Sequence, residues 1–118
     1  MPARRLDGLG LEIRDALAVK IDTQGAEALV IAGGRGVLAR AGLLALEFWP
    51  YALAANVGDV GVILDFLREN FQHGEIVPGD SAEPTEREPI AALVSRLAIL
   101  ADTDRTDLDV YHDVWLSK

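Results

Sequence analysis

The sequence contains no cysteine and no long hydrophobic run, and acidic residues outnumber basic ones. The lack of cysteine excludes a disulfide scaffold, a thiolate zinc site and a cysteine nucleophile, and it is consistent with a reducing cytoplasm. The longest apolar stretches, near Leu43–Phe48 and Leu97–Ala101, are far shorter than the roughly 20 residues of a membrane helix. Charges also interrupt the apolar segment that a secretion signal would need near the N-terminus. We therefore expect a cytoplasmic protein that does not bind membranes.

The charge balance limits the partners of the chain. Its 118 residues include 11 lysines and arginines but 19 acidic residues, for a formal net charge of −8. This balance disfavours nucleic acid and anionic membranes as main partners. The acidic excess is concentrated between residues 74 and 109, where it is typical of solvated surface loops. The length and the 50% hydrophobic content predict a single domain over residues 1–118.

Two short apolar segments, Leu17–Asp22 and Leu43–Phe48, are typical of strands that are covered on both faces of a parallel sheet. Between them, apolar residues recur every three or four positions and predict a helix. That face comprises Ala26, Leu29, Val30, Gly33, Val37, Leu38 and Ala41. Because glycine weakens a helix by up to about 1 kcal/mol relative to alanine, we expect a break near Gly33 and Gly34. Gly42 is the expected helix stop.

The second half of the chain continues this alternation. We expect a helix over Val57–Gln72 capped by Asp59, a short strand over Gly74–Pro78, a surface loop over Gly79–Glu88, a helix from Pro89 to about Leu100, and a strand over Val110–Leu116. The proline limits the Gly74–Pro78 strand to a sheet edge or to a strand end. Strands that alternate with helices predict an α/β layered sheet with right-handed crossovers.

The turn after the first strand carries two carboxylates. Asp22 ends the strand, Gly25 permits a tight turn, and Glu27 falls in the first turn of the helix, where a negative charge is favourable. Ligands of open parallel sheets bind beyond the carboxyl ends of the strands, so this is the expected ligand face. Taken alone, these residues favour a structural role, with Asp22 as a cap or turn residue and Glu27 as a dipole partner, over a binding role.

The same segment resembles a family signature. Residues 20–27 read KIDTQGAE and are similar to the KIDvEGaE signature of the FkbM family of S-adenosylmethionine-dependent methyltransferases. Arg5–Leu9 resembles the upstream "tLDdl" element of that family, and Ala28–Gly33 resembles its "evLkGa" continuation. Leu44–Phe48 resembles its next strand, which ends in glutamate, and Val110–Lys118 resembles its last strand. The resemblance covers most of the chain and is weak after Gly58.

The resemblance implies the C-terminal half of a Rossmann-like methyltransferase, with strands four to seven of its sheet and their flanking helices. Such an enzyme transfers a methyl group from S-adenosylmethionine to a hydroxyl of a small molecule or glycan. The implied catalytic residues are Asp22, Glu27 and Glu47, one of which orients or deprotonates the acceptor. The implied cofactor-binding residues are Lys20, Asp22, Gln24 and Gly25. Gln24 stands where the family has glutamate, which removes one charge from the loop.

The family's main cofactor loop has no counterpart in this sequence. In the complete fold, a glycine-rich turn after the first strand and an acidic residue after the second hold most of the cofactor. No strand followed by such a turn precedes Asp22, and Gly33–Gly36 lies in or after a helix. We therefore expect the chain to need an N-terminal half for cofactor binding. The alternative is a non-catalytic α/β module that pairs with a second copy or another partner through an exposed edge beside Leu17–Asp22.

Other candidate chemistry is weak. His73 and His112 have no ligand-spaced neighbour, so we expect no metal site. None of Ser81, Ser95 and Ser117 lies in a nucleophile-elbow context. Trp49 and Tyr51 follow the second strand at the expected ligand face, where aromatic rings either cover an acceptor or pack at the rim.

Overall fold

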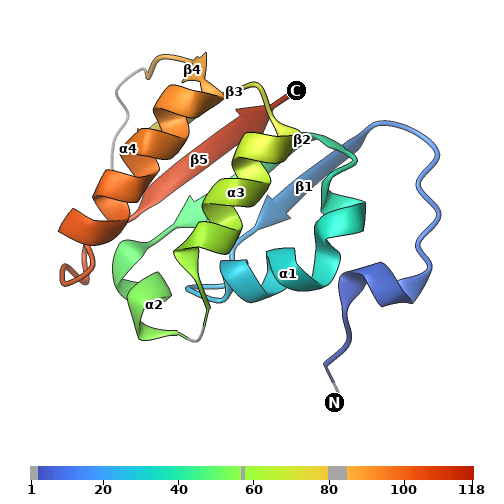
Figure 1. The fold of residues 1–118 in the computed structure, drawn as a ribbon, viewed down its shortest axis with the longest axis horizontal. Coiled ribbons are helices and arrows are strands. Elements are labelled where there is room, and N and C mark those ends of the chain that lie inside the picture. Colours follow the sequence, from blue (N-terminus) through green and yellow to red (C-terminus); the bar gives the residue numbers. More distant parts are fainter. Residues whose placement is uncertain (1–2, 57, 80–84) are drawn as a thin grey trace.

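A computed structural model describes residues 3–56, 58–79 and 85–118. Within these residues, five strands form one mixed sheet in the order β1-β2-β5-β3-β4 (Figure 1). The strands are β1 (Leu17–Ile21), β2 (Ala41–Phe48), β3 (His73–Pro78), β4 (Glu88–Pro89) and β5 (His112–Ser117). β1 and β2 are parallel, whereas β5 is antiparallel to both of its neighbours. This sheet is compatible with part of a Rossmann-like fold.

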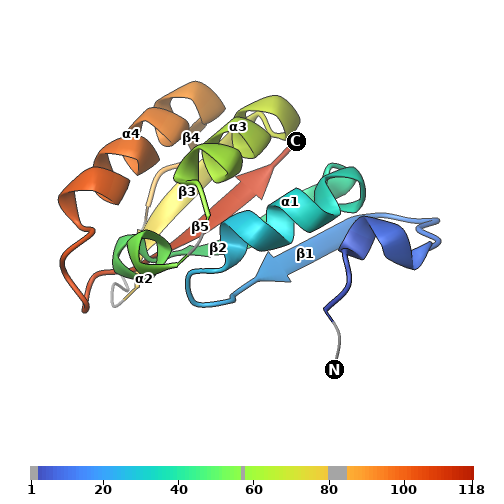
Figure 2. The same cartoon turned by 60° about the horizontal axis from the view of Figure 1, so that its bottom comes forward.

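The longer helices lie side by side on one face of the sheet (Figure 2). The helices are the 3-10 helix η1 (Leu6–Leu9), α1 (Glu27–Leu38), α2 (Pro50–Ala55), α3 (Val60–Asn70) and α4 (Ile90–Thr103). The core between sheet and helices is apolar and fully buried, and it includes Ile31, Leu44, Phe48, Ile63, Phe66, Leu67, Leu93, Leu97 and Leu116. The expected α/β class is confirmed. The Cα radius of gyration of the structure is 14.0 Å.

Several expected elements are confirmed with small shifts. β1, β2 and β5 begin or end within two residues of their expected positions, and Asp59 caps α3 by accepting a hydrogen bond from the Gly61 amide. α1 is broken where expected, because Gly34 has non-helical angles (φ −134°, ψ 16°). β3 ends at Pro78, as its proline requires. Val57, the expected first residue of the helix that the structure shows as α3, lies outside the described residues.

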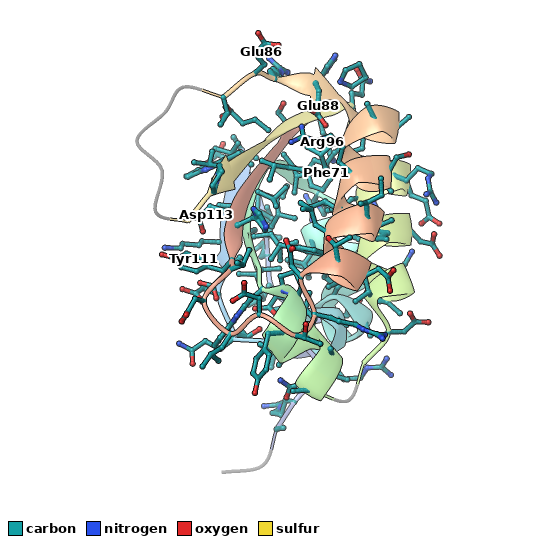
Figure 3. All side chains as sticks on the ribbon, turned by 90° about the vertical axis from the view of Figure 1, so that its left-hand side faces the viewer. Phe71, Glu86, Glu88, Arg96, Tyr111 and Asp113 are labelled. Carbon is teal, nitrogen blue, oxygen red and sulfur yellow. The ribbon has the colours of Figure 1, made fainter. Side chains whose placement is uncertain are left out.

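Other expectations are wrong. Gly42 does not stop α1, which ends at Leu38, and lies inside β2. Pro89 belongs to β4 and precedes α4 instead of starting it, and the ion pair of Glu88 with Arg96 holds β4 to α4 (Figure 3). Neither α2 nor β4 was expected, because each is too short to show a periodic pattern. In the expected loop over Gly79–Glu88, residues 80–84, including Ser81, lie outside the described residues.

The strands are not covered on both faces, in contrast to the expectation from their apolar runs. In the described part of the chain, no helix covers the second face of the sheet, which we term the open face (Figure 2). Leu43 and Trp115 are 43% and 44% exposed there. The apolar run of β2 conceals an alternation, because Leu43 faces solvent while Leu44 is buried.

Strand register places the residues of the open face in rows. Lys20 pairs with Ala45, Ala45 with Trp115, and Trp115 with Glu75. One row closer to the carboxyl ends of β1 and β2, Glu47 pairs with Asp113. Asp22 directly follows Ile21, whose partner is Leu46, so register places Asp22 beside Glu47.

Candidate functional site

The carboxyl ends of β1 and β2 lie beside the amino end of β5 at one end of the sheet, and each of these strand ends supplies a carboxylate. We term this set, Asp22, Glu47 and Asp113, the acidic rim. Alternation along the strands directs all three toward the open face, since Ile21, Leu46 and Val114 are buried on the helix side. Figure 3 shows Asp113 on β5, with the helices on the other side of the sheet. Two of the three expected catalytic residues thus lie side by side.

Glu47 is the titratable centre of the rim. Burial and the charge of Asp22 are the largest causes that raise its pKa to about 7, and a hydrogen bond with Asp22 adds to them. The charges of Glu27 and Asp113 act in the same direction. A carboxyl with a pKa near 7 exchanges its proton at neutral pH, which is the property that a general base or acid requires.

Glu27, the third expected catalytic residue, has a different environment. Its side chain is 1% exposed. Oε1 accepts a hydrogen bond from the Thr23 amide, and Oε2 accepts one from the Gly25 amide, both at 2.9 Å. Both carboxylate oxygens are thus engaged by the turn that follows β1. Glu27 fixes the backbone that carries Asp22, and it reaches Glu47 only through its charge.

The turn itself depends on backbone conformations that few residues adopt. Gln24 has φ 53° and Gly25 has φ 107°. A side chain at Gly25 would lie 2.4 Å from Nδ2 of Asn56 and 2.6 Å from the carbonyl oxygen of Ala52. Gly25 therefore lets the turn pack directly against α2. The sequence gives no signal for this contact, since α2 was not expected.

The expected cofactor-binding residues do not gather at one place. Asp22 belongs to the rim, and Gln24 is exposed in the turn. Gly25 is buried against α2, whereas Lys20 lies on the open face. Lys20 lines a small cavity of about 90 Å³ there, together with Ala45, Leu46, Glu47, Asp113 and Trp115.

A larger cavity, of about 450 Å³, opens beside the acidic rim. Its lining residues are Glu47, Trp49, Leu108, Asp109 and Tyr111, and we term it the rim pocket. Glu47 belongs to both the rim and the pocket. Trp49 was expected to cover an acceptor or to pack at the rim, and it forms one wall. Leu108, Asp109 and Tyr111 were missed, because they come from an irregular loop that only the folded sheet brings to β2.

The two histidines do not meet. His112 pairs with Pro78 and His73 with Ser117, at opposite ends of the β3–β5 ladder. His112 is buried, and its Nε2 lies 3.4 Å from Oδ2 of Asp104. Across the described ranges, no group of three or more histidine, aspartate or glutamate side chains is arranged to hold a metal ion. None of the described helices is both long and apolar enough to span a membrane.

Comparisons with known proteins do not identify the chain. No protein-family model matches it. No curated protein and no solved structure matches it either. The resemblance of residues 20–27 to a family signature therefore stays a prediction from the sequence.

Proposed function

We propose that this chain is the acceptor-side half of an FkbM-like O-methyltransferase of the cytoplasm. The observation that carries the proposal is Glu47, a carboxyl with a pKa near 7 that lies beside Asp22 and lines the rim pocket. A molecule in that pocket presents its hydroxyl group to this carboxyl. The ionised form of Glu47 accepts the hydroxyl proton, and the acceptor oxygen becomes a nucleophile.

Asp22 and Glu27 have supporting parts in this proposal. The negative charge of Asp22 keeps Glu47 basic enough to remove a proton, because it disfavours a second charge beside it. Glu27 fixes the turn that positions Asp22. The acceptor is a small molecule or glycan, as the family resemblance implies.

The described residues do not form a complete site for S-adenosylmethionine. When bound, this cofactor supplies an electrophilic methyl group on a positively charged sulfur, and the acidic rim complements that charge. However, no described strand that precedes β1 feeds a glycine-rich turn. Gly34 and Gly36 serve another purpose, since they let η1 pack on α1. The proposal therefore requires a cofactor-binding half that these residues do not form.

The proposal is tested by adding a cofactor-binding half to the chain. The cofactor-binding half of a known S-adenosylmethionine-dependent methyltransferase is fused to the N-terminus of the chain, and calorimetry verifies cofactor binding by the fusion. Transfer of a tritiated methyl group is then measured on a panel of hydroxyl-bearing small molecules and glycans. We expect transfer that falls at least ~100-fold in Glu47→Gln, the lower range for loss of a general base.

The matched control is Glu12→Gln, which removes one exposed carboxylate far from the rim and should leave transfer unchanged. A fusion that binds the cofactor but methylates nothing, or that remains fully active as Glu47→Gln, contradicts the proposal. Calorimetry on the unfused chain should detect no cofactor binding, and low-micromolar affinity would show that the chain holds the cofactor by itself.

A second candidate function is a non-catalytic module that pairs through β1. The observation in its favour is that β1 is an edge strand of the described sheet, so one row of its amide and carbonyl groups lacks a strand partner there. Size-exclusion chromatography with light scattering distinguishes the two functions. A stable dimer supports pairing, whereas a monomer at high concentration rejects it.

A further inference from the structure

The rim pocket has walls that are fixed before any ligand arrives. The Trp49 indole N–H donates a hydrogen bond to the Leu108 carbonyl oxygen at 3.1 Å, which ties the strand end to the opposite loop. The Tyr111 hydroxyl donates to the Gly79 carbonyl oxygen at 3.2 Å, and the Gly79 amide donates to the Tyr111 carbonyl oxygen at 2.9 Å. Two aromatic side chains of the lining are thus held in place by hydrogen bonds to backbone carbonyl groups.

Tyr111 packs closely against Gly79. A side chain at Gly79 would lie 2.1 Å from Cε2 of the Tyr111 ring, so only glycine permits this packing. The ring is therefore held both by the hydrogen bond of its hydroxyl group and by the close contact of its carbon atoms with Gly79. Such preorganised walls reduce the entropy that a ligand loses on binding.

The charged side chains of the pocket lining are all acidic. Glu47 and Asp109 are the ionisable carboxyl groups of the lining, and none of the five lining residues is basic. Asp113 lies directly opposite Glu47 in the β2–β5 ladder, where paired like charges are unfavourable. Lys20 lines the smaller cavity on the open face together with Glu47 and Asp113, and it does not line the rim pocket. A positive charge in the rim pocket would be attracted by the carboxylates of its lining.

The aromatic rings and the carboxylates of the pocket together indicate which class of ligand it binds. The face of an indole or phenol ring attracts an organic cation, and a carboxylate beside the ring completes the site with an ion pair. A neutral polyol could stack on the same rings, but it would leave the carboxylate charges uncompensated. An anion would be repelled by the lining and by the rim.

We infer that the rim pocket binds a small molecule with a protonated amine, held against Trp49 and Tyr111 and paired with Asp109. The identity of the methyl acceptor rests in addition on the proposed function. On that basis, the acceptor is an amino alcohol or amino sugar. Its ammonium group occupies the pocket, and its hydroxyl group faces the Glu47 carboxyl.

The test is a titration of the ¹⁵N-labelled chain, without cofactor, with three molecules of the same six-carbon skeleton. Glucamine carries an ammonium group, sorbitol is neutral, and gluconate is an anion. The readout is the indole N–H signal of Trp49, assigned by its loss in Trp49→Phe. We expect saturable shifts with glucamine, at least tenfold weaker binding of sorbitol, and no shift with gluconate.

Two variants locate the cation. Asp109→Asn should weaken glucamine binding at least fivefold and leave sorbitol unaffected, whereas the matched control Glu12→Gln should change neither. Asp109 is exposed, so its substitution leaves the core intact. Equal binding of sorbitol and glucamine, no binding of glucamine, or shifts confined to signals away from Trp49 would each overturn the inference. Because no methyl transfer is measured, these outcomes are independent of the fusion assay.

Discussion

Glu27 is a buried carboxylate whose charge is stabilised by backbone groups. Its two oxygens accept hydrogen bonds from two amides of the turn, and it lies at the amino end of α1, where the helix dipole favours a negative charge. Charge-assisted hydrogen bonds of this kind are roughly twice as strong as neutral ones. The side chain therefore offsets the cost of its own burial and orders the turn.

We predict that Glu27→Gln destabilises the fold by about 1–3 kcal/mol, because one amide of the turn then faces an NH₂ group instead of an acceptor. Urea unfolding followed by circular dichroism measures this change. Glu69→Gln is the control, since Glu69 forms an exposed pair with Arg35 and should cost less than about 1 kcal/mol. An unchanged unfolding midpoint in Glu27→Gln would show that the two hydrogen bonds contribute nothing.

Glu47 and Glu27 show how surroundings assign different parts to the same side chain. Hydrogen-bond donors surround the Glu27 carboxylate, whereas Glu47 is partly buried and feels the charges of the nearby carboxylates. The first environment keeps a charge in place, and the second makes a charge costly. The surroundings of Glu47 therefore favour proton exchange near neutral pH.

At the scale of elements, the break in α1 is capped by a distant residue. Gly34 leaves the helical conformation, and the amides of Gly36 and Val37 donate hydrogen bonds to the two oxygens of Asp7 at 3.0 and 2.9 Å. These bonds lower the pKa of Asp7. A side chain at Gly34 would lie 2.8 Å from Cδ2 of Leu6, so glycine also lets η1 approach the helix. The glycines of α1 thus provide the surface on which η1 packs.

We predict that Asp7→Ala lowers the melting temperature by several degrees at pH 7, because the second segment of α1 loses its cap. Since the folded pKa of Asp7 is lowered, its contribution is present above pH 3.8, the ordinary value, and is lost as the pH falls through the folded value. The difference between wild type and variant should therefore shrink in acid. Thermal melts at pH 7 and pH 3 measure it, with Asp15→Ala as control. Equal melting at pH 7 contradicts the capping role.

The sequence predicts those elements whose signals are local. The apolar runs of β1 and β2, the periodicity of α3 with its cap Asp59, and the glycine break in α1 can each be read within a few residues. The open face could not be predicted, because an apolar run does not reveal which alternate residues a helix covers. Asp22 and Glu47 were predictable as strand-end residues. Asp109 and Tyr111 were not, since tertiary structure alone brings their loop to the rim.

At the scale of the whole molecule, the acidic rim exists only in the folded sheet. Three strands that are far apart in sequence each bring one carboxylate to it. The repulsion among these carboxylates should appear in the pH dependence of the free energy of unfolding. Because folding raises the pKa of Glu47 from 4.5 to about 7, stability is highest at low pH with respect to this group and falls as the pH rises through about 7.

We predict that Glu47→Gln removes this loss. Glutamine stays neutral and can still donate a hydrogen bond to Asp22, so the variant should melt a few degrees above wild type at pH 8. Below pH 4.5 the two proteins should melt alike, because Glu47 is then protonated in both the folded and unfolded chain. Thermal melts across this pH range measure the effect. A variant that is less stable than wild type at pH 8 contradicts the predicted charge repulsion.

The most direct measurement is the titration of the Glu47 carboxyl itself. Carbon-13 NMR of the side-chain carboxyl, assigned with Glu47→Gln, follows its protonation in the folded chain and in urea. We predict a pKa of about 7 when the chain is folded and the ordinary 4.5 when it is unfolded. In Asp22→Asn the folded value should fall toward 4.5, because the neighbouring charge is gone. A folded pKa near 4.5 in the wild-type protein would leave the rim without a base and would contradict the proposed function.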